Sequence, residues 1–284
     1  MNSQTASAQD VAAEMQLLYD ASLPELLARA KQLIESLPAK SLPFAQQVFF
    51  STVERLFILV QDISNNYLSD LEAGYFTTAG LTRSLLETAT LLALFNRDQT
   101  AKTLSAFLEK QEKDARKRRE SLARLRNASN SHVASAAQNE TRIADGVVAA
   151  LKKVRLGAGL PVSAKAFPDM AGRCRMLGEH WEFIYHAVYR DLCEAVHGAF
   201  LKTPHAPTLA FASPNRGAAL IYEHSRTFGY AVEFWGCAVL DCCVNHSDTN
   251  AVARFREKLG KLIEQDHVLL IKFPASSQKH TITF

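Results

Sequence analysis

Residues 81–95 read LTRSLLETATLLALF, an apolar run in which Arg83 and Glu87 are the only charged residues. Its leucines recur at the three- and four-residue spacing of a helix, and no convincing alternating strand pattern occurs in the chain. The sequence therefore predicts an all-α fold: a multi-helix bundle with a projecting charged helical hairpin.

A second stretch, residues 181–200, reads WEFIYHAVYRDLCEAVHGAF and is also apolar with a few polar residues. On an unbroken helix, five of these would share an arc of about 100°: His186, Arg190, Cys193, Glu194 and His197. A charge in apolar surroundings is costly unless it is paired and hydrogen-bonded. The two stretches together are therefore the candidate site.

Both stretches also have a purely structural interpretation. In the second, an arginine and a glutamate are spaced i,i+4, a pair that is common on exposed helix faces and stabilises a helix by about 0.3 kcal/mol. Arg83 and Glu87 have the same spacing in a helix that we expect to be buried, where an ion pair would fix helix packing. The functional alternative places this pair opposite Tyr189 and His197 in a polar cavity.

Composition narrows the class of protein. Hydrophobic residues make up 48% of the chain and charged residues 21%, which is typical of a globular protein, and a net charge of +3 does not by itself imply a nucleic-acid partner. No secretory signal and no run of ~18 apolar residues is present, so we expect no membrane association. Five cysteines without a C-x-x-C pair indicate a reducing cytoplasm and no bound metal or cofactor.

Breaks in the helical pattern suggest a domain organisation. We predict an N-terminal helical segment over residues 1–40, a core over 41–98 and 160–266, an inserted helical hairpin over 99–156 and a flexible tail over 267–284. Within the core, Asn65-Asn66 predicts a break or kink in a helix, and Asp248 is placed to open the last helix.

The hairpin is predicted from two matching apolar stripes. The outgoing stripe has heptad-like spacing, with interruptions at Gln111 and Arg118, and consists of Leu104, Leu108, Ala115, Leu122 and Leu125. After a polar turn, the returning stripe consists of Ile143, Val147, Leu151 and Val154. Together they predict two antiparallel helices.

The outgoing helix also holds the one concentration of basic residues. Its candidate RNA contacts are Arg116, Lys117, Arg118 and Arg119, which would steer phosphates if the protein binds RNA. Acidic residues are interleaved with them and aromatic stacking residues are missing, so a solvated, ion-paired helix face is the alternative.

Arg190 and His197 carry the catalytic hypothesis. A histidine moves protons near neutral pH and an arginine holds a phosphate, so together they would support metal-independent RNA cleavage. Arg190-Asp191, five residues and then His197 is similar to the arginine-polar-histidine motif of the helical HEPN superfamily. That resemblance implies a ribonuclease whose site forms where two copies meet, hence RNA as a partner and a homodimer.

Similar spacings elsewhere leave the choice of pair open. Arg126-Asn127 precedes His132 at a comparable distance, and Arg173 and Arg175 precede His180. We prefer Arg190 and His197 because they lie in a long predicted helix beside two tyrosines.

The two stretches together resemble a bacterial, all-helical family classed as a domain of unknown function, with R-x3-E followed by Y-x3-Y-x2-L-x4-H-G. The matching residues are Arg83, Glu87, Tyr185, Tyr189, Leu192, His197 and Gly198. The resemblance covers about residues 40–247 and implies a cytosolic helical protein in which Arg83, Glu87, Tyr185 and Tyr189 support the site.

Two functions follow as expectations. The first is a HEPN-like, metal-independent ribonuclease, in a toxin or phage-defence setting that comes from the resemblance alone. The second is a non-catalytic helical interaction or oligomerisation module in which every charged pair is structural.

Overall fold

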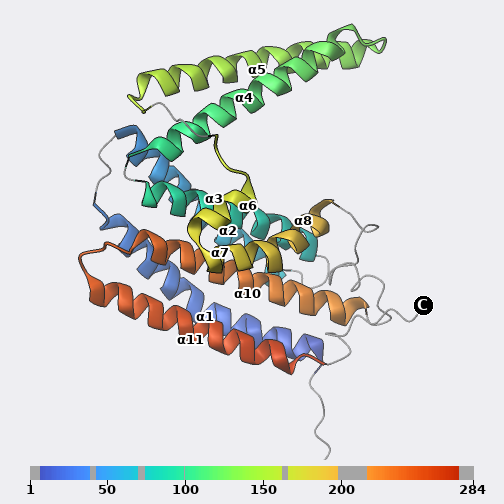
Figure 1. Cartoon of the computed structure of the whole chain (residues 1–284). Helices are drawn as coiled ribbons and strands as arrows, with labels where there is room; N and C mark the ends of the chain where they lie inside the picture. The colour runs from blue at the N-terminus through green and yellow to red at the C-terminus, as the bar shows by residue number, and fades with distance from the viewer. Residues whose placement is uncertain are drawn as a thin grey trace, which may run out of the picture. The chain divides into compact units, whose positions relative to one another are not determined.

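The computed structural model describes residues 7–38, 43–69, 74–98, 100–161, 166–197 and 216–274, apart from the side chains of Leu68, Ser69, Glu194 and His197. Every regular element within these ranges is a helix, which confirms the predicted all-α bundle (Figure 1). Among the helices described, none combines the length and the apolar character that crossing a bilayer requires.

The chain divides into two compact units, with the boundary falling inside α2 and α3. The core unit comprises the described residues of Met1–Ala39, Phe49–Ala93 and Met170–Phe284, and the hairpin unit those of Lys40–Val48 and Leu94–Asp169. The helices are α1 (Ala8–Glu35), α2 (Pro43–Ser69), α3 (Tyr75–Arg97), α4 (Lys102–Arg124), α5 (Ser131–Gly157), α6 (Met170–Leu177), α7 (Glu179–Ile184), α8 (Arg190–His197), α10 (Arg216–Cys242) and α11 (Thr249–Lys272).

Helix α10 forms the centre of the core unit because apolar residues occur on nearly every side of it. Phe228 stacks on Tyr67 of α2 with ring centroids 4.5 Å apart, and Trp235 meets Phe255 of α11 edge-on at 5.9 Å. All four rings are buried. Burying an aromatic ring stabilises a fold by about 2 kcal/mol or more, so these contacts hold α2 and α11 against α10.

The outer layer of the core unit pairs the first described helix with the last. Helices α1 and α11 lie side by side (Figure 1), and Lys258 of α11 bonds to Glu25 of α1 at 2.6 Å. Ser7 caps α1 with a reciprocal bond to Asp10, and the Asp248 side chain caps α11 as its position predicts.

Two predicted features of the core are wrong. Helix α2 runs through Asn65-Asn66 without a break, because the Asn66 side chain bonds to Gly74 O (2.9 Å) and Thr78 Oγ1 instead of competing with its own backbone. Helix α11 continues past Asp266 to Lys272, so the start of the predicted tail is helical. The rest of that tail, from residue 275, lies outside the described residues.

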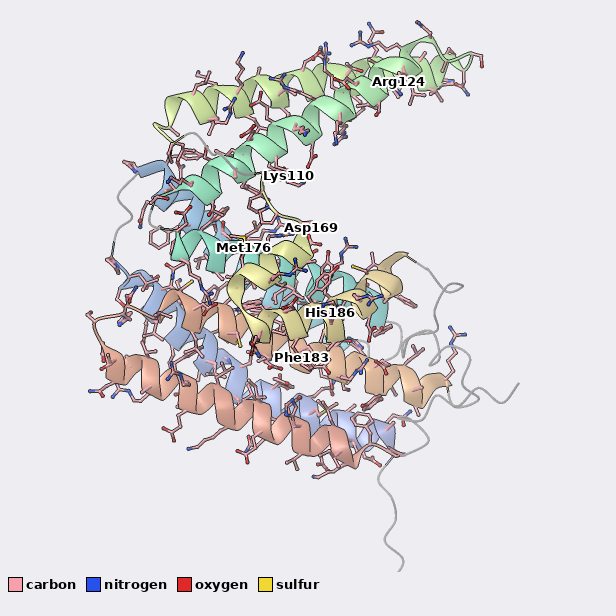
Figure 2. The ribbon with its side chains drawn as sticks, in the orientation of Figure 1. Lys110, Arg124, Asp169, Met176, Phe183 and His186 are labelled. Atoms are coloured by element: carbon pink, nitrogen blue, oxygen red, sulfur yellow. The ribbon has the colours of Figure 1, made fainter. Side chains whose placement is uncertain are left out.

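In the hairpin unit, α4 and α5 pack together and are joined by a short 3₁₀ turn, Leu125–Asn127. The Asn130 side chain accepts bonds from the first amides of α5, which explains why the polar turn ends there. Figure 2 labels Lys110 and Arg124 on α4, the latter next to the turn. The helical hairpin predicted around 99–156 is thus present within this unit.

Candidate functional site

The side chains of Arg83 and Glu87 lie on a partly exposed side of α3 and not deep in the core. Arg83 Nε is 3.2 Å from Glu87 Oε1, and the side chains are 25% and 37% exposed. The neighbouring Leu85, Leu86 and Leu92 are fully buried, so most of the helix surface is covered as expected. The pair is therefore half-buried, and solvent partly screens its charges.

Tyr189 connects this pair to the second stretch. Its hydroxyl donates a 2.7 Å hydrogen bond to Glu87 Oε1, and the Arg83 guanidinium lies 5.7 Å from the centre of its ring. Tyr185 stacks on Tyr189 with ring centroids 5.5 Å apart. The structure thus brings Arg83 and Glu87 together with Tyr185 and Tyr189, although about a hundred residues separate the two pairs in the chain.

The surroundings of Tyr189 and Arg83 raise the pKa of both groups. Burial raises the pKa of Tyr189 well above its ordinary value, and the bond to the Glu87 carboxylate and its charge raise it further. Burial works to lower the pKa of Arg83, but the bond to Tyr189 and the nearby Cys193 and Glu87 outweigh burial and raise it. Near neutral pH, Tyr189 therefore keeps its proton and donates a hydrogen bond, and Arg83 is a cation.

The second stretch is not one continuous α-helix. A π-helical turn, Tyr185–Tyr189, separates α7 from α8; it includes the exposed His186, which is labelled in Figure 2. Five residues on an α-helix rotate by about 140° beyond a full turn, whereas a π turn returns residue i+5 close to residue i. This wider turn brings Tyr189 back to the buried side that Ile184 occupies, where it reaches Glu87.

The predicted arc of five polar residues assumed an unbroken helix and needs correction. The π turn shifts the residues before it by about one position, or 100°, relative to those after it. His186 therefore no longer belongs to the arc, while Arg190 and His197 remain on one regular helix with a rise of about 10 Å between them.

The two predicted catalytic residues differ in how far they are described. Arg190 is exposed at the start of α8. The side chains of His197 and of Glu194 lie outside the described residues, as does Gly198. Asp191, the polar residue after the arginine in the motif, lies 4.0 Å from Arg226 of α10, which also pairs with the buried Glu223 at 2.7 Å.

The alternative arginine and histidine pairs lie in other surroundings. Arg126 and His132 are exposed at the turn of the hairpin. Arg173 donates to Glu87 O and Thr90 Oγ1 of α3, both at 3.4 Å, and His180 Nε2 is 3.7 Å from Cys237 Sγ. Sequence reasoning missed the position of Arg173 beside Glu87, because its one available signal was a cation in a short apolar helix.

The predicted RNA contacts are mostly engaged with carboxylates of the hairpin. Arg116 pairs with the buried Glu112, which also bonds Arg155 of α5 at 3.2 Å. Arg118 pairs with Glu140 at 3.0 Å, and Arg119 pairs with Asp145. Lys117 is exposed. Three of the four cations thus brace the hairpin.

The cysteines of the described part of the chain lie on three helices and the loop after the last of them, and its possible metal ligands form no cluster. No group of three or more histidine, cysteine, aspartate or glutamate residues is arranged there to hold a metal ion. The five cysteines form no disulfide. Burial raises the pKa of Cys174 and Cys243 to about 11 each, so these two thiols are poor nucleophiles near neutral pH.

Compared with protein families, with curated proteins and with solved structures, the chain gives no match in any of the three. The resemblances to the HEPN superfamily and to the bacterial domain family therefore stay predictions from the motifs.

Proposed function

We propose that this chain is a metal-independent ribonuclease whose catalytic groups are Arg190 and His197. In this reaction His197 removes the proton of a ribose 2′-hydroxyl, whose oxygen attacks the adjacent phosphorus; the bond from phosphorus to the 5′-oxygen breaks, and that oxygen takes a proton from water. Arg190 binds the phosphate and stabilises the negative charge that develops on it. The products are a 2′,3′-cyclic phosphate and a 5′-hydroxyl end.

The observation that carries the proposal is the bond from the Tyr189 hydroxyl to Glu87 Oε1, with Arg83 on the same oxygen. Tyr189 directly precedes Arg190, so this network fixes the start of α8 against α3. A catalytic group acts efficiently only when its position is held, and a network beneath an exposed arginine provides that support.

The proposal extends to the setting of the reaction. RNA is the substrate, and a second copy of the chain completes the site, as the resemblance to the HEPN superfamily implies. The free cysteines accord with a cytoplasmic location. Growth restriction in a bacterial toxin or phage-defence system is the biological role that the motifs suggest.

One observation favours the second candidate, a non-catalytic interaction module. Three of the four cations that would contact RNA form ion pairs with carboxylates of the hairpin. A protein evolved to bind phosphates through this helix would leave more of its cations available.

The test is cleavage of total cellular RNA by the purified protein in excess EDTA. We expect cleavage by the wild type and a loss of at least about a hundredfold in both His197→Ala and Arg190→Ala, because each removes a group that acts in the transition state. His132→Ala and His180→Ala are matched controls that remove the histidines of the competing motifs, and each should retain activity.

Each other result has a definite meaning. Loss of cleavage in His132→Ala or His180→Ala alone would move the site to that motif. Equal cleavage by all variants would reveal a contaminating nuclease and contradict the proposal. An inactive wild type would favour the interaction module.

A further inference from the structure

Phe183 of α7 is the most exposed phenylalanine, tyrosine or tryptophan in the part of the chain that the structure describes. Its side chain is 67% exposed, whereas that of the next residue, Ile184, is 2% exposed; Figure 2 labels Phe183 on α7. An aromatic ring in water carries a free-energy cost that a contact on its face removes. The ring is therefore available to a ligand.

Phe183 begins an exposed row of residues that leads to Arg190. Ala187 is exposed four residues after Phe183 and Arg190 is exposed seven after it, whereas Ile184 and Val188 between them are buried. At a rise of about 1.5 Å per residue, Phe183 and Arg190 are about 10 Å apart along the helix. The methyl group of Ala187 is too small to fill the space between them, so one ligand can lie along the row and contact both.

The charges of this row differ from one end to the other. Within the described part of the chain Arg190 forms no ion pair, so its positive charge is open to an anion. Glu182, the carboxylate next to Phe183, is paired with Arg175 at 3.5 Å. Glu179, one turn before Phe183, is exposed. A ligand that fits this row therefore has a negative group at Arg190 and an uncharged group at Phe183.

Single-stranded RNA has this arrangement of groups, because an uncharged planar base is joined to each phosphate through the ribose. Aromatic side chains stack on unpaired bases in many RNA-binding proteins, whereas a duplex keeps the faces of its bases covered. An apolar protein partner is a poorer fit, since it needs a wider apolar surface than one ring between Glu179 and Ala187.

We propose that Phe183 is a stacking platform for an unpaired RNA base, next to the phosphate that Arg190 binds. This inference rests on the proposed function, because it takes Arg190 as the phosphate-binding group. It adds that the substrate is single-stranded at this place and that Phe183 contributes to its affinity.

The test is the binding of a fluorescein-labelled RNA strand to the full-length protein, followed by fluorescence anisotropy. The strand has about 12 nucleotides and is 2′-O-methylated throughout, so it lacks the attacking hydroxyl and binding is measured without cleavage. We expect Phe183→Ala and Phe183→Leu to bind about tenfold more weakly than the wild type, because both lose the flat ring. Phe183→Trp should bind at least as tightly as the wild type.

The matched control is Phe50→Ala, which removes a 38% exposed phenylalanine from α2 and should leave the affinity unchanged. The same sequence as a duplex is a second control: the wild type should prefer the single strand, and Phe183→Ala should lose that preference. Circular dichroism verifies that each variant is helical.

Three results would overturn the proposal: equal binding by the wild type and Phe183→Ala, full binding by Phe183→Leu, or a wild type that does not bind the single strand. Cleavage of the unmethylated strand by the same proteins reports on the catalytic proposal separately. Cleavage by the wild type together with unchanged affinity in Phe183→Ala would leave the ribonuclease in place and remove the platform. A ring-dependent affinity without cleavage would do the reverse.

Discussion

Asp266 is a buried carboxyl in the core unit, and it should make the stability of this protein fall as the pH rises from 4 to 6. Its side chain is 2% exposed, and Oδ1 accepts a 2.7 Å hydrogen bond from Tyr19 of α1. Gly229 of α10 lies so close that a Cβ there would stand 2.5 Å from Oδ2. Burial raises the pKa of Asp266 from 3.8 to about 6, against the bond from Tyr19 and the charge of His267, which lower it.

The sign follows from proton binding. The folded state holds the Asp266 proton more tightly than the unfolded state does, so the contribution to stability is complete below about pH 4 and is lost as the pH rises through about 6. A difference of about two pH units corresponds to about 3 kcal/mol, at 1.36 kcal/mol per unit. Near pH 7 the charged carboxylate therefore destabilises the fold by about this amount.

Asp266→Asn removes the titration while keeping the shape and the acceptor for Tyr19. We expect the difference in unfolding free energy between variant and wild type to grow by about 3 kcal/mol in favour of the variant from pH 4 to pH 7. Urea unfolding followed by circular dichroism at several pH values measures it. Asp20→Asn, which removes an exposed carboxylate of α1, is the control and should change stability by less than about 0.5 kcal/mol at every pH.

A pH-independent difference between Asp266→Asn and the wild type would refute this reasoning, because it would mean that Asp266 titrates alike in both states. A difference that shrinks as the pH rises would show that the bond from Tyr19 dominates over burial. Either result would also remove the argument that this carboxyl limits stability at neutral pH.

Two further substitutions test the packing of the core and of the candidate site. Gly236→Ala should lower the unfolding free energy by about 1–3 kcal/mol, because the new methyl group meets a buried leucine of α11. Gly260→Ala is the control: it has open space around it and should raise the unfolding free energy by up to about 1 kcal/mol. Thermal unfolding of both variants distinguishes the two effects. Tyr189→Phe should lower the unfolding free energy, measured by urea unfolding, by about 1 kcal/mol, because the hydrogen bond to Glu87 is lost. An equally large decrease in Tyr185→Phe would show that this hydrogen bond contributes nothing specific.

Local rules predicted those parts of the fold in which the sequence pattern and the packing agree. The polar turn of the hairpin and the cap at Asp248 follow from residue types whose side chains satisfy free amides at helix starts. The break expected at Asn65-Asn66 failed because a distant partner decides the outcome: the Asn66 side chain bonds to the start of α3, and no local rule contains that contact.

The sequence pointed to several residues of the cluster around Glu87, but not to the geometry that joins them. Helical spacing placed Arg83 one turn from Glu87, and the second stretch pointed to Tyr189. The π turn was not predictable, because it differs from an α-helix by one hydrogen-bond register and arises where burial of Tyr189 beside α3 favours the wider turn. The neighbouring Arg173 was missed for a different reason, because its partners on α3 are far away in the sequence.

The pairing of α1 with α11 also constrains how the protein folds as it is made. Glu25 and Lys258, which bond across these helices, are separated by 233 residues. At about 5–20 residues per second, a ribosome takes about 10 to 50 s to reach Lys258 after Glu25 has been added. During that interval the apolar face of α1 has no α11 to cover it, so the nascent chain offers a binding site for chaperones, and the core closes only after α11 has been made.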